Sequence, residues 1–183
     1  MAMLMTYTDC LERYETKYNI GKQVAEGNLF KLEKGIYSDE RCVPEYQIIS
    51  VKYPNAVFTM DSAFYYHNLT DVIPDMYYLM TDRGSSKISD KRVVQRFENS
   101  KALLYLGAEY IDYNGINLRM YNRERMLLEL LRNKNKLPFD YYKEIIRNYR
   151  RIIYELDMQS IQEMMLALPK AGMIKKLLET EVL

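Results

Sequence analysis

Apolar residues recur at helical spacing near the start of the chain and predict a helix that begins at Thr6. Thr6 and Asp9 fit the capping box, in which a hydroxyl and a carboxylate each accept a hydrogen bond from a free backbone amide. The positions that share the apolar face are Tyr7, Cys10, Leu11, Tyr14 and Tyr18. A second short helix is expected from Asn19, which can cap it, and Gly27 suits a left-handed stop.

Alternation replaces helical spacing in the next segment. Phe30 and Leu32 alternate with charged neighbours, and Gly35 allows a tight turn before the chain returns, which predicts a β-hairpin. Helix, turn, helix and hairpin is the order of a winged helix-turn-helix, in which one helix enters the major groove of DNA. A purely structural helix–hairpin unit stays open as an alternative, because acidic and basic residues balance in this segment.

After the hairpin, the sequence predicts two helices and then a segment with the composition of β-strands. Helices are expected from Pro44 to Lys52 and from about Thr59 to His67. The segments that follow and resemble strands are Tyr77–Met80, Val93–Phe97, Leu103–Leu106, Glu109–Tyr113 and Ile116–Tyr121. Asn114-Gly115, between the last two segments, is the strongest short hairpin signal in the chain.

From Asn122 onward the pattern is helical. The longest helix is expected over about residues 138–156, and its apolar face consists of Tyr142, Ile145, Ile146, Tyr149, Ile152, Ile153 and Leu156. Asp157 can cap another helix, and Pro169 and Gly172 separate a last one. The predicted class is therefore α+β. A small winged-helix domain spans 1–40, and a mixed domain spans 41–183, with an antiparallel-rich sheet in 76–121 and helices in 122–183.

Composition narrows the partners without naming them. The chain has 183 residues, with 26 Lys and Arg against 25 Asp and Glu, which excludes a histone-like polycation and an acidic disordered tail. Residues 119–151 nevertheless carry ten basic and four acidic side chains, a local charge of +6. The polar side of the long helix carries Lys143, Arg147, Arg150 and Arg151. This face is either solvated or a second basic surface for nucleic acid or an acidic partner.

Candidate chemistry is sparse. Two cysteines cannot build a disulfide framework, and with no signal segment or apolar span we expect a cytoplasmic protein that does not contact a membrane. The single histidine, His67, has no motif that supplies catalytic partners, so we expect a structural role. No metal-binding, nucleophile or phosphate-loop motif occurs. We expect no enzyme, no cofactor and no metal; a nucleic-acid-processing enzyme is the remaining alternative.

Four stretches in the same order resemble one known family. They are EGNLFKLEKGIYSD at 26–39, YPNAVFTMDSAFYYHNLTDVIPD at 53–75, YNRERMLLELLR at 121–132, and the terminal set of helices. The sequence looks like an AbiEi-family antitoxin, the transcriptional-regulator half of abortive-infection (type IV) toxin–antitoxin systems. The resemblance covers nearly the whole chain, and the second and third stretches are its most specific parts.

The resemblance implies a function for each domain. The winged helix would bind operator DNA and repress its own two-gene operon, and the larger domain would counteract a nucleotidyltransferase-type toxin, without a tight complex being required. An interaction module that neutralises a toxin by direct contact, with a degenerate winged helix, is the alternative. The candidate DNA contacts in or before the second helix are Lys17, Asn19, Lys22 and Gln23, and those on the hairpin are Lys31 and Lys34.

Overall fold

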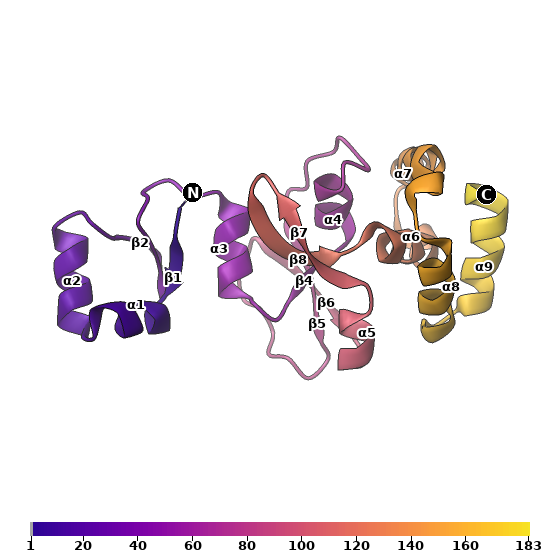
Figure 1. Ribbon diagram of the computed structural model, residues 1–183. Helices are drawn as coiled ribbons and strands as arrows, with labels where there is room; N and C mark the ends of the chain where they lie inside the picture. Colours follow the sequence, from indigo (N-terminus) through magenta and orange to yellow (C-terminus); the bar gives the residue numbers. More distant parts are fainter. Residues whose placement is uncertain (1) are drawn as a thin grey trace. The chain divides into compact units, whose positions relative to one another are not determined.

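The structure, a computed structural model, describes residues 2–183 and divides into two compact units. The first unit comprises residues 1–55 and 114–116, and the second comprises 56–113 and 117–183. Figure 1 shows their elements along the chain. The boundary predicted at 40/41 is therefore displaced to 55/56. The reason is helix α3 (Glu45–Lys52), which packs against strands β1 (Leu4–Thr6) and β3 (Ile36–Ser38) and so completes the first unit.

The first unit has the predicted helix–helix–hairpin order, preceded by a strand that the sequence pattern did not predict. After β1 come α1 (Tyr7–Tyr14), α2 (Lys17–Ala25), β2 (Phe30–Glu33) and β3, and the sheet order is β1-β3-β2 with antiparallel pairs. The capping box at Thr6 is confirmed, with Asp9 N donating to Thr6 Oγ1 at 3.2 Å and Thr6 N donating to Asp9 Oδ2 at 2.7 Å. Gly35 turns the hairpin at a φ of 81°.

The turn between α1 and α2 lies earlier than predicted. Glu15 adopts a φ of 67°, which ends α1, and the hydroxyl of Thr16 accepts a hydrogen bond from Asn19 N at 3.1 Å. Thr16, and not Asn19, is therefore the N-cap of α2. Tyr18 consequently lies on α2, where 80% of it is exposed, and not on the apolar face of the first helix.

The second unit is built on a five-stranded sheet. Its strands are β4 (Val57–Phe58), β5 (Tyr77–Asp82), β6 (Val93–Glu98), β7 (Ala108–Tyr113) and β8 (Ile116–Tyr121), in the order β6-β5-β4-β8-β7. The pairs β5–β6 and β4–β8 are parallel, and β4–β5 is antiparallel. The sheet is thus mixed and not antiparallel-rich, because residues 83–92 return the chain so that β6 runs in the direction of β5. Asn114 and Gly115 join β7 to β8 at φ values of 54° and 81°, as a two-residue hairpin turn requires.

Helices form the remainder of the second unit. They are α4 (Met60–Tyr66), α5 (Lys101–Tyr105), α6 (Arg123–Arg132), α7 (Phe139–Ile152), α8 (Met158–Ala167) and α9 (Ala171–Leu177), followed by a π-helical segment, η3 (Leu178–Val182). The strand predicted at Leu103–Leu106 is wrong. Its residues belong largely to α5, since Ser100 Oγ accepts a hydrogen bond from Leu103 N at 3.2 Å and so caps a helix there.

A buried ion network lies inside the second unit. Arg125 of α6 is fully buried and contacts Glu98 at 3.3 Å and Glu129 at 3.0 Å, and Arg132 contacts the same two carboxylates. The Arg125 guanidinium also donates to the carbonyl oxygens of Leu103 and Leu106. These bonds tie α6 to the end of β6 and to α5. Within residues 2–183, none of the helices has the length and hydropathy that crossing a membrane requires.

Candidate nucleic-acid interface

The exposed face of α2 is the first part of the candidate interface. Its solvent-facing residues are Lys17, Tyr18, Gly21, Lys22, Val24 and Ala25, whereas Ile20 is buried in the core of the first unit. In a helix-turn-helix, the second helix enters the major groove and its N-terminal residues reach the base edges. Lys17 and Tyr18 occupy that end of α2, so the exposed face offers cations and one aromatic ring to a ligand.

The two lysines of α2 are available to phosphates. No ion pair of Lys17 is found in the described part of the chain. Lys22 lies 3.8 Å from Glu26 in an exposed i,i+4 pair, whose side chains are 59% and 44% exposed. Exposed pairs of this kind contribute little free energy. A phosphate can therefore displace Glu26 from Lys22 at small cost.

Asn19 and Gln23 are placed differently from the lysines. The side-chain amide of Asn19 donates to the carbonyl of Tyr14 at 2.9 Å, so this half-buried residue fixes the turn before α2. The side-chain oxygen of Gln23 accepts a hydrogen bond from Asn28 at 3.2 Å and fixes the approach to the hairpin. Both predicted contacts thus lie beside the exposed face, where they hold the geometry of α2.

The hairpin supplies the second part of the interface. Lys31 and Lys34 are exposed, and Lys34 stands in the turn next to Gly35. Glu33 is the acidic residue between them, and its carboxylate contacts Lys52 at 3.0 Å. Because Lys52 neutralises this carboxylate, the tip of the hairpin presents net positive charge to a phosphate backbone.

The first unit as a whole is close to neutral. Residues 1–55 contain seven Lys and Arg against eight Asp and Glu. Attraction to a polyanion therefore depends on where the charges lie, namely on α2 and on the hairpin tip, and not on the total.

Sequence reasoning missed two residues of the exposed face, Tyr18 and Gly21. The spacing of Tyr18 continues the apolar pattern of the first helix and so predicts, wrongly, that it lies there. The signal that could have placed it correctly is Thr16, a favoured N-cap residue one turn before Asn19. A methyl group added at Gly21 would meet no atom within 4 Å, so internal packing does not require glycine there.

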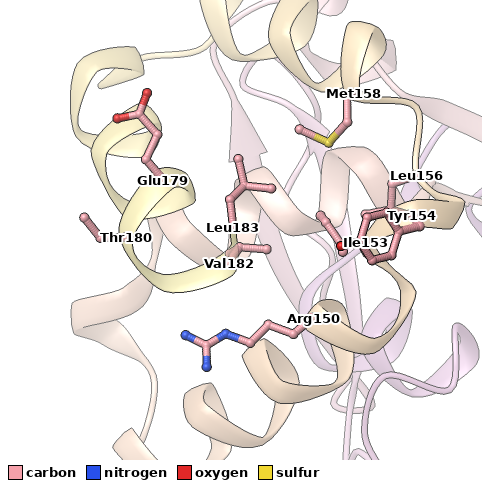
Figure 2. A pocket seen from close by; sticks show the side chains of 9 residues that line it. All are labelled: Arg150, Ile153, Tyr154, Leu156, Met158, Glu179, Thr180, Val182 and Leu183. Atoms are coloured by element: carbon pink, nitrogen blue, oxygen red, sulfur yellow. The ribbon is translucent and has the colours of Figure 1, made fainter.

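The predicted second basic surface lies on α7 in the second unit. Lys143, Arg147, Arg150 and Arg151 are all exposed on this helix. Arg150 also lines an open groove of about 810 Å³, shown in Figure 2, between the end of α7 and η3. Its wall is mixed: Ile153, Leu156, Met158, Val182 and Leu183 are apolar, and Tyr154, Glu179 and Thr180 stand beside them.

The single histidine, His67, is buried and links two elements of the second unit. It is buried, and its Nε2 donates to the carbonyl of Tyr121 at 2.7 Å, which fixes the position of the proton on the neutral ring. Burial lowers the pKa of His67 below its ordinary value of 6.5, although the bond to the carbonyl opposes the shift. The ring therefore joins α4 to β8. Residues 2–183 contain no cluster of three or more His, Cys, Asp or Glu side chains arranged to hold a metal ion.

Comparisons with known proteins establish the fold. No family model matches the sequence, and no curated protein matches it. Among solved structures, the crystal structure of the RV2827C protein from Mycobacterium tuberculosis is similar, with a TM-score of 0.64 and 12% sequence identity. The match covers 97% of this chain and 71% of that one. The α+β class is thereby confirmed, and at this identity the similarity concerns the fold alone.

Proposed function

We propose that this chain is a DNA-binding antitoxin that represses its own type IV toxin–antitoxin operon, as its resemblance to the AbiEi family implies. The observation that carries the DNA-binding part is the exposed face of α2, which stands behind a tight turn and ahead of a basic-tipped hairpin. This arrangement supports insertion of a helix into the major groove with a hairpin beside it.

The proposal gives each of the exposed residues of α2 and of the hairpin discussed above a role in DNA binding. Lys17 and Lys22 bind phosphates on either side of the groove, and Tyr18 contacts the base edges or sugars near the start of α2. Lys31 and Lys34 contact the phosphate backbone from the hairpin. Asn19 and Gln23 act by holding α2 in position, since their side chains already bond within the unit.

Direct DNA binding tests this part of the proposal. Fluorescence anisotropy would compare a duplex from upstream of the chain's own gene with a scrambled duplex, between about 50 and 200 mM salt. We expect preference for the first duplex and an affinity that falls steeply with salt. Removing one phosphate contact with Lys17→Ala or Lys34→Ala should lower the salt slope by about 1. Lys101→Ala, at an exposed lysine of the second unit, is the matched control. Equal affinity for both duplexes would remove the repressor function.

The second unit carries the antitoxin part of the proposal. It would counteract a nucleotidyltransferase-type toxin in the cytoplasm, and the chain itself would have no catalytic activity, cofactor or metal. When the chain is co-expressed with the adjacent gene's product, it should relieve the growth arrest that this product causes. Variants of the chain that no longer bind DNA should relieve it as well. Turnover of nucleotides, DNA or RNA by the purified chain with Mg²⁺ or Mn²⁺ would contradict this part and favour a nucleic-acid-processing enzyme.

The groove beside α7 favours a second candidate function, a protein-interaction module that neutralises the toxin by direct contact. Its wall of apolar side chains together with Arg150 and Glu179 offers a surface for a protein. Co-elution of the chain with the toxin at micromolar concentration would support this alternative, whereas rescue of growth without co-elution would support indirect antagonism.

A further inference from the structure

The outer face of α7 carries a row of cationic and aromatic side chains, which we call the α7 stripe. At about 100° and 1.5 Å per residue, its positions fall within an arc of about 120° and extend over about 22 Å. The side chains that α7 buries lie on the other side of the helix. The α7 stripe consists of Phe139, Lys143, Arg147, Arg150, Arg151 and, in the short 3-10 helix η2 (Ile153–Glu155), Tyr154, and all six are exposed.

Both ends of the α7 stripe are aromatic. Phe139, at the start of α7, is 68% exposed, and Tyr154 is 99% exposed. The ammonium group of Lys143 lies 5.5 Å from the centre of the Phe139 ring. Within residues 2–183 the side chain of Tyr154 has no hydrogen bond and no ring contact, and it stands at the rim of the open groove beside η3 (Figure 2). The core needs neither ring, and exposed rings of this kind stack on nucleobases.

The cations of the α7 stripe keep their charge available to a ligand. Residues 2–183 provide no ion pair for any of its four basic residues. Arg150 donates from its Nε to the carbonyl of Glu181 at 2.8 Å, and Arg151 donates to the side-chain oxygen of Asn148 at 3.3 Å. Neutral acceptors therefore orient both guanidinium groups and leave their charges without a counterion.

The carboxylates around the α7 stripe are engaged elsewhere. Glu144 of α7 accepts a hydrogen bond from the hydroxyl of Thr70 at 2.8 Å. The others form ion pairs, which are Glu155 with Arg123 at 3.4 Å, Glu179 with Lys175 at 4.0 Å, and Glu181 with Lys134. Among the described acidic residues of α7, Asp140 is the exposed one. The α7 stripe thus sets four cations against one carboxylate, which favours a polyanionic ligand.

The combination of cations and rings favours one class of polyanion. A duplex offers phosphates, but its bases are stacked on one another and hide their faces. An acidic protein segment can pair with the cations but has no series of flat rings. A single strand presents phosphates at regular intervals together with unstacked bases, and it therefore matches both features of the α7 stripe.

We propose that the α7 stripe binds single-stranded nucleic acid. The four basic side chains contact successive phosphates, and bases stack on Phe139 and Tyr154. The contact tolerates different sequences, because every base has a π face. This site is separate from the exposed face of α2 and does not depend on the proposed operator binding.

Binding of a labelled single strand to the full chain tests the proposal. Fluorescence anisotropy would use oligo(dT) and oligo(U) of about 12 nucleotides between about 50 and 200 mM salt. A plot of log association constant against log salt should have a slope of about −3, since each neutralised phosphate of a single strand contributes about −0.7. Equal affinities would assign the site to both nucleic acids, and tighter binding of one strand would identify its source. Failure of both strands to bind overturns the proposal.

Two double variants separate stacking from charge, with thermal melts to show that each is folded. Phe139→Ala with Tyr154→Ala should raise the dissociation constant about tenfold or more and leave the salt slope unchanged, because it removes rings and no cation. Arg147→Ala with Arg151→Ala should reduce the magnitude of the slope by about 1.4.

Each double variant has a matched control in the second unit. Phe97→Ala with Tyr110→Ala changes aromatic residues that are 49% and 63% exposed, and Lys87→Ala with Lys91→Ala removes two exposed cations from the connection between β5 and β6. Both controls should bind the single strands like the wild type. An aromatic variant of the α7 stripe that also binds like the wild type overturns the proposal.

A variant of α2 separates the two surfaces. Lys17→Ala with Lys22→Ala should weaken binding of the duplex and leave the dissociation constant for oligo(dT) and oligo(U) unchanged. Single-strand binding that is lost in this variant, and kept in both variants of the α7 stripe, overturns the proposal. A wild-type chain without preference for its upstream duplex would remove the repressor function and leave single-strand binding by the α7 stripe in place.

Discussion

The two units use the same local motif, an i,i+4 pair of opposite charges, in opposite ways. Lys22 and Glu26 of the first unit form a pair whose side chains are 59% and 44% exposed, whereas Arg125 and Glu129 of the second unit are 0% and 1% exposed. In water the first pair contributes little, so Lys22 stays free for a ligand. In the interior the second pair must stay intact, because one charge without its partner is very costly there. Sequence spacing is identical in the two cases, and burial alone decides the role.

The two units also differ in the size of their buried cores. Among the described residues, eight apolar side chains are buried in the first unit and thirty-two in the second. A small core leaves most of α2 at the surface, which suits a helix that presents side chains to DNA. A large core can hold charged groups inside, since many neighbours position them.

Arg125→Ala is the change with the largest expected effect on this comparison. It leaves Glu98 and Glu129 buried with one arginine fewer, and we expect the second unit to lose about 3–5 kcal/mol of unfolding free energy. Lys22→Ala, its exposed counterpart, should change stability by less than about 0.5 kcal/mol. Urea unfolding measured by circular dichroism checks both. Similar losses in the two variants would show that burial does not separate the pairs.

The ion network also shows why the candidate surfaces were only partly predictable. The sequence places ten basic residues between 119 and 151, and their excess suggested one basic surface. In the structure Arg125 and Arg132 of that stretch turn inward to Glu98, which is far away in the sequence. The four residues on α7 are exposed as expected, because the regular apolar pattern of that helix fixes its polar side. Local periodicity thus predicts which face is exposed, whereas a distant carboxylate cannot be inferred from it.

Local signals predicted much of the fold for the same reason. The capping box at Thr6, the turn at Asn114-Gly115 and the helix after Pro44 depend on neighbouring residues, and all three are present. The parallel pairing of β5 with β6 depends on how a ten-residue connection crosses the sheet, which no local pattern encodes. The exposed position of Tyr18 was missed because a single residue, Glu15, ends α1 in a conformation unusual for a non-glycine residue.

Ile20→Ala should break the first unit and leave the second intact. Ile20 is 3% exposed in the five-residue cluster, and removing its side chain should cost about 2–5 kcal/mol. We expect loss of DNA binding while the far-UV signal and the melting of the second unit persist. Calorimetry with two resolved transitions checks this. One cooperative transition that shifts as a whole would mean that the two units unfold together.

His67 should make the stability of the second unit depend on pH. Its pKa is lowered in the folded state from 6.5, so the unfolded chain binds more protons as the pH falls below that value. The stability is complete above about pH 7 and declines with falling pH, at no more than about 1.4 kcal/mol per pH unit for one proton. His67→Gln should flatten the melting temperature between about pH 7.5 and 5.5, where carboxylates contribute little. Because the chain has one histidine, an unchanged slope in this variant would exclude the assignment.

Gly21→Ala has a small expected effect on stability and separates stability from binding. Alanine should stabilise α2 by about 0.5–1 kcal/mol, because glycine is a poor helix former and the added methyl group meets no atom within 4 Å. The same methyl group lies on the exposed face of α2, so we expect weaker DNA binding from a more stable protein. Gly172→Ala in α9 is the matched control, since it also lies in a helix with open space around it and should stabilise without affecting DNA. Equal DNA affinity in both variants would mean that the face of α2 around Gly21 does not approach the duplex. This pair of variants therefore measures the effect of the methyl group on helix stability separately from its effect on DNA binding.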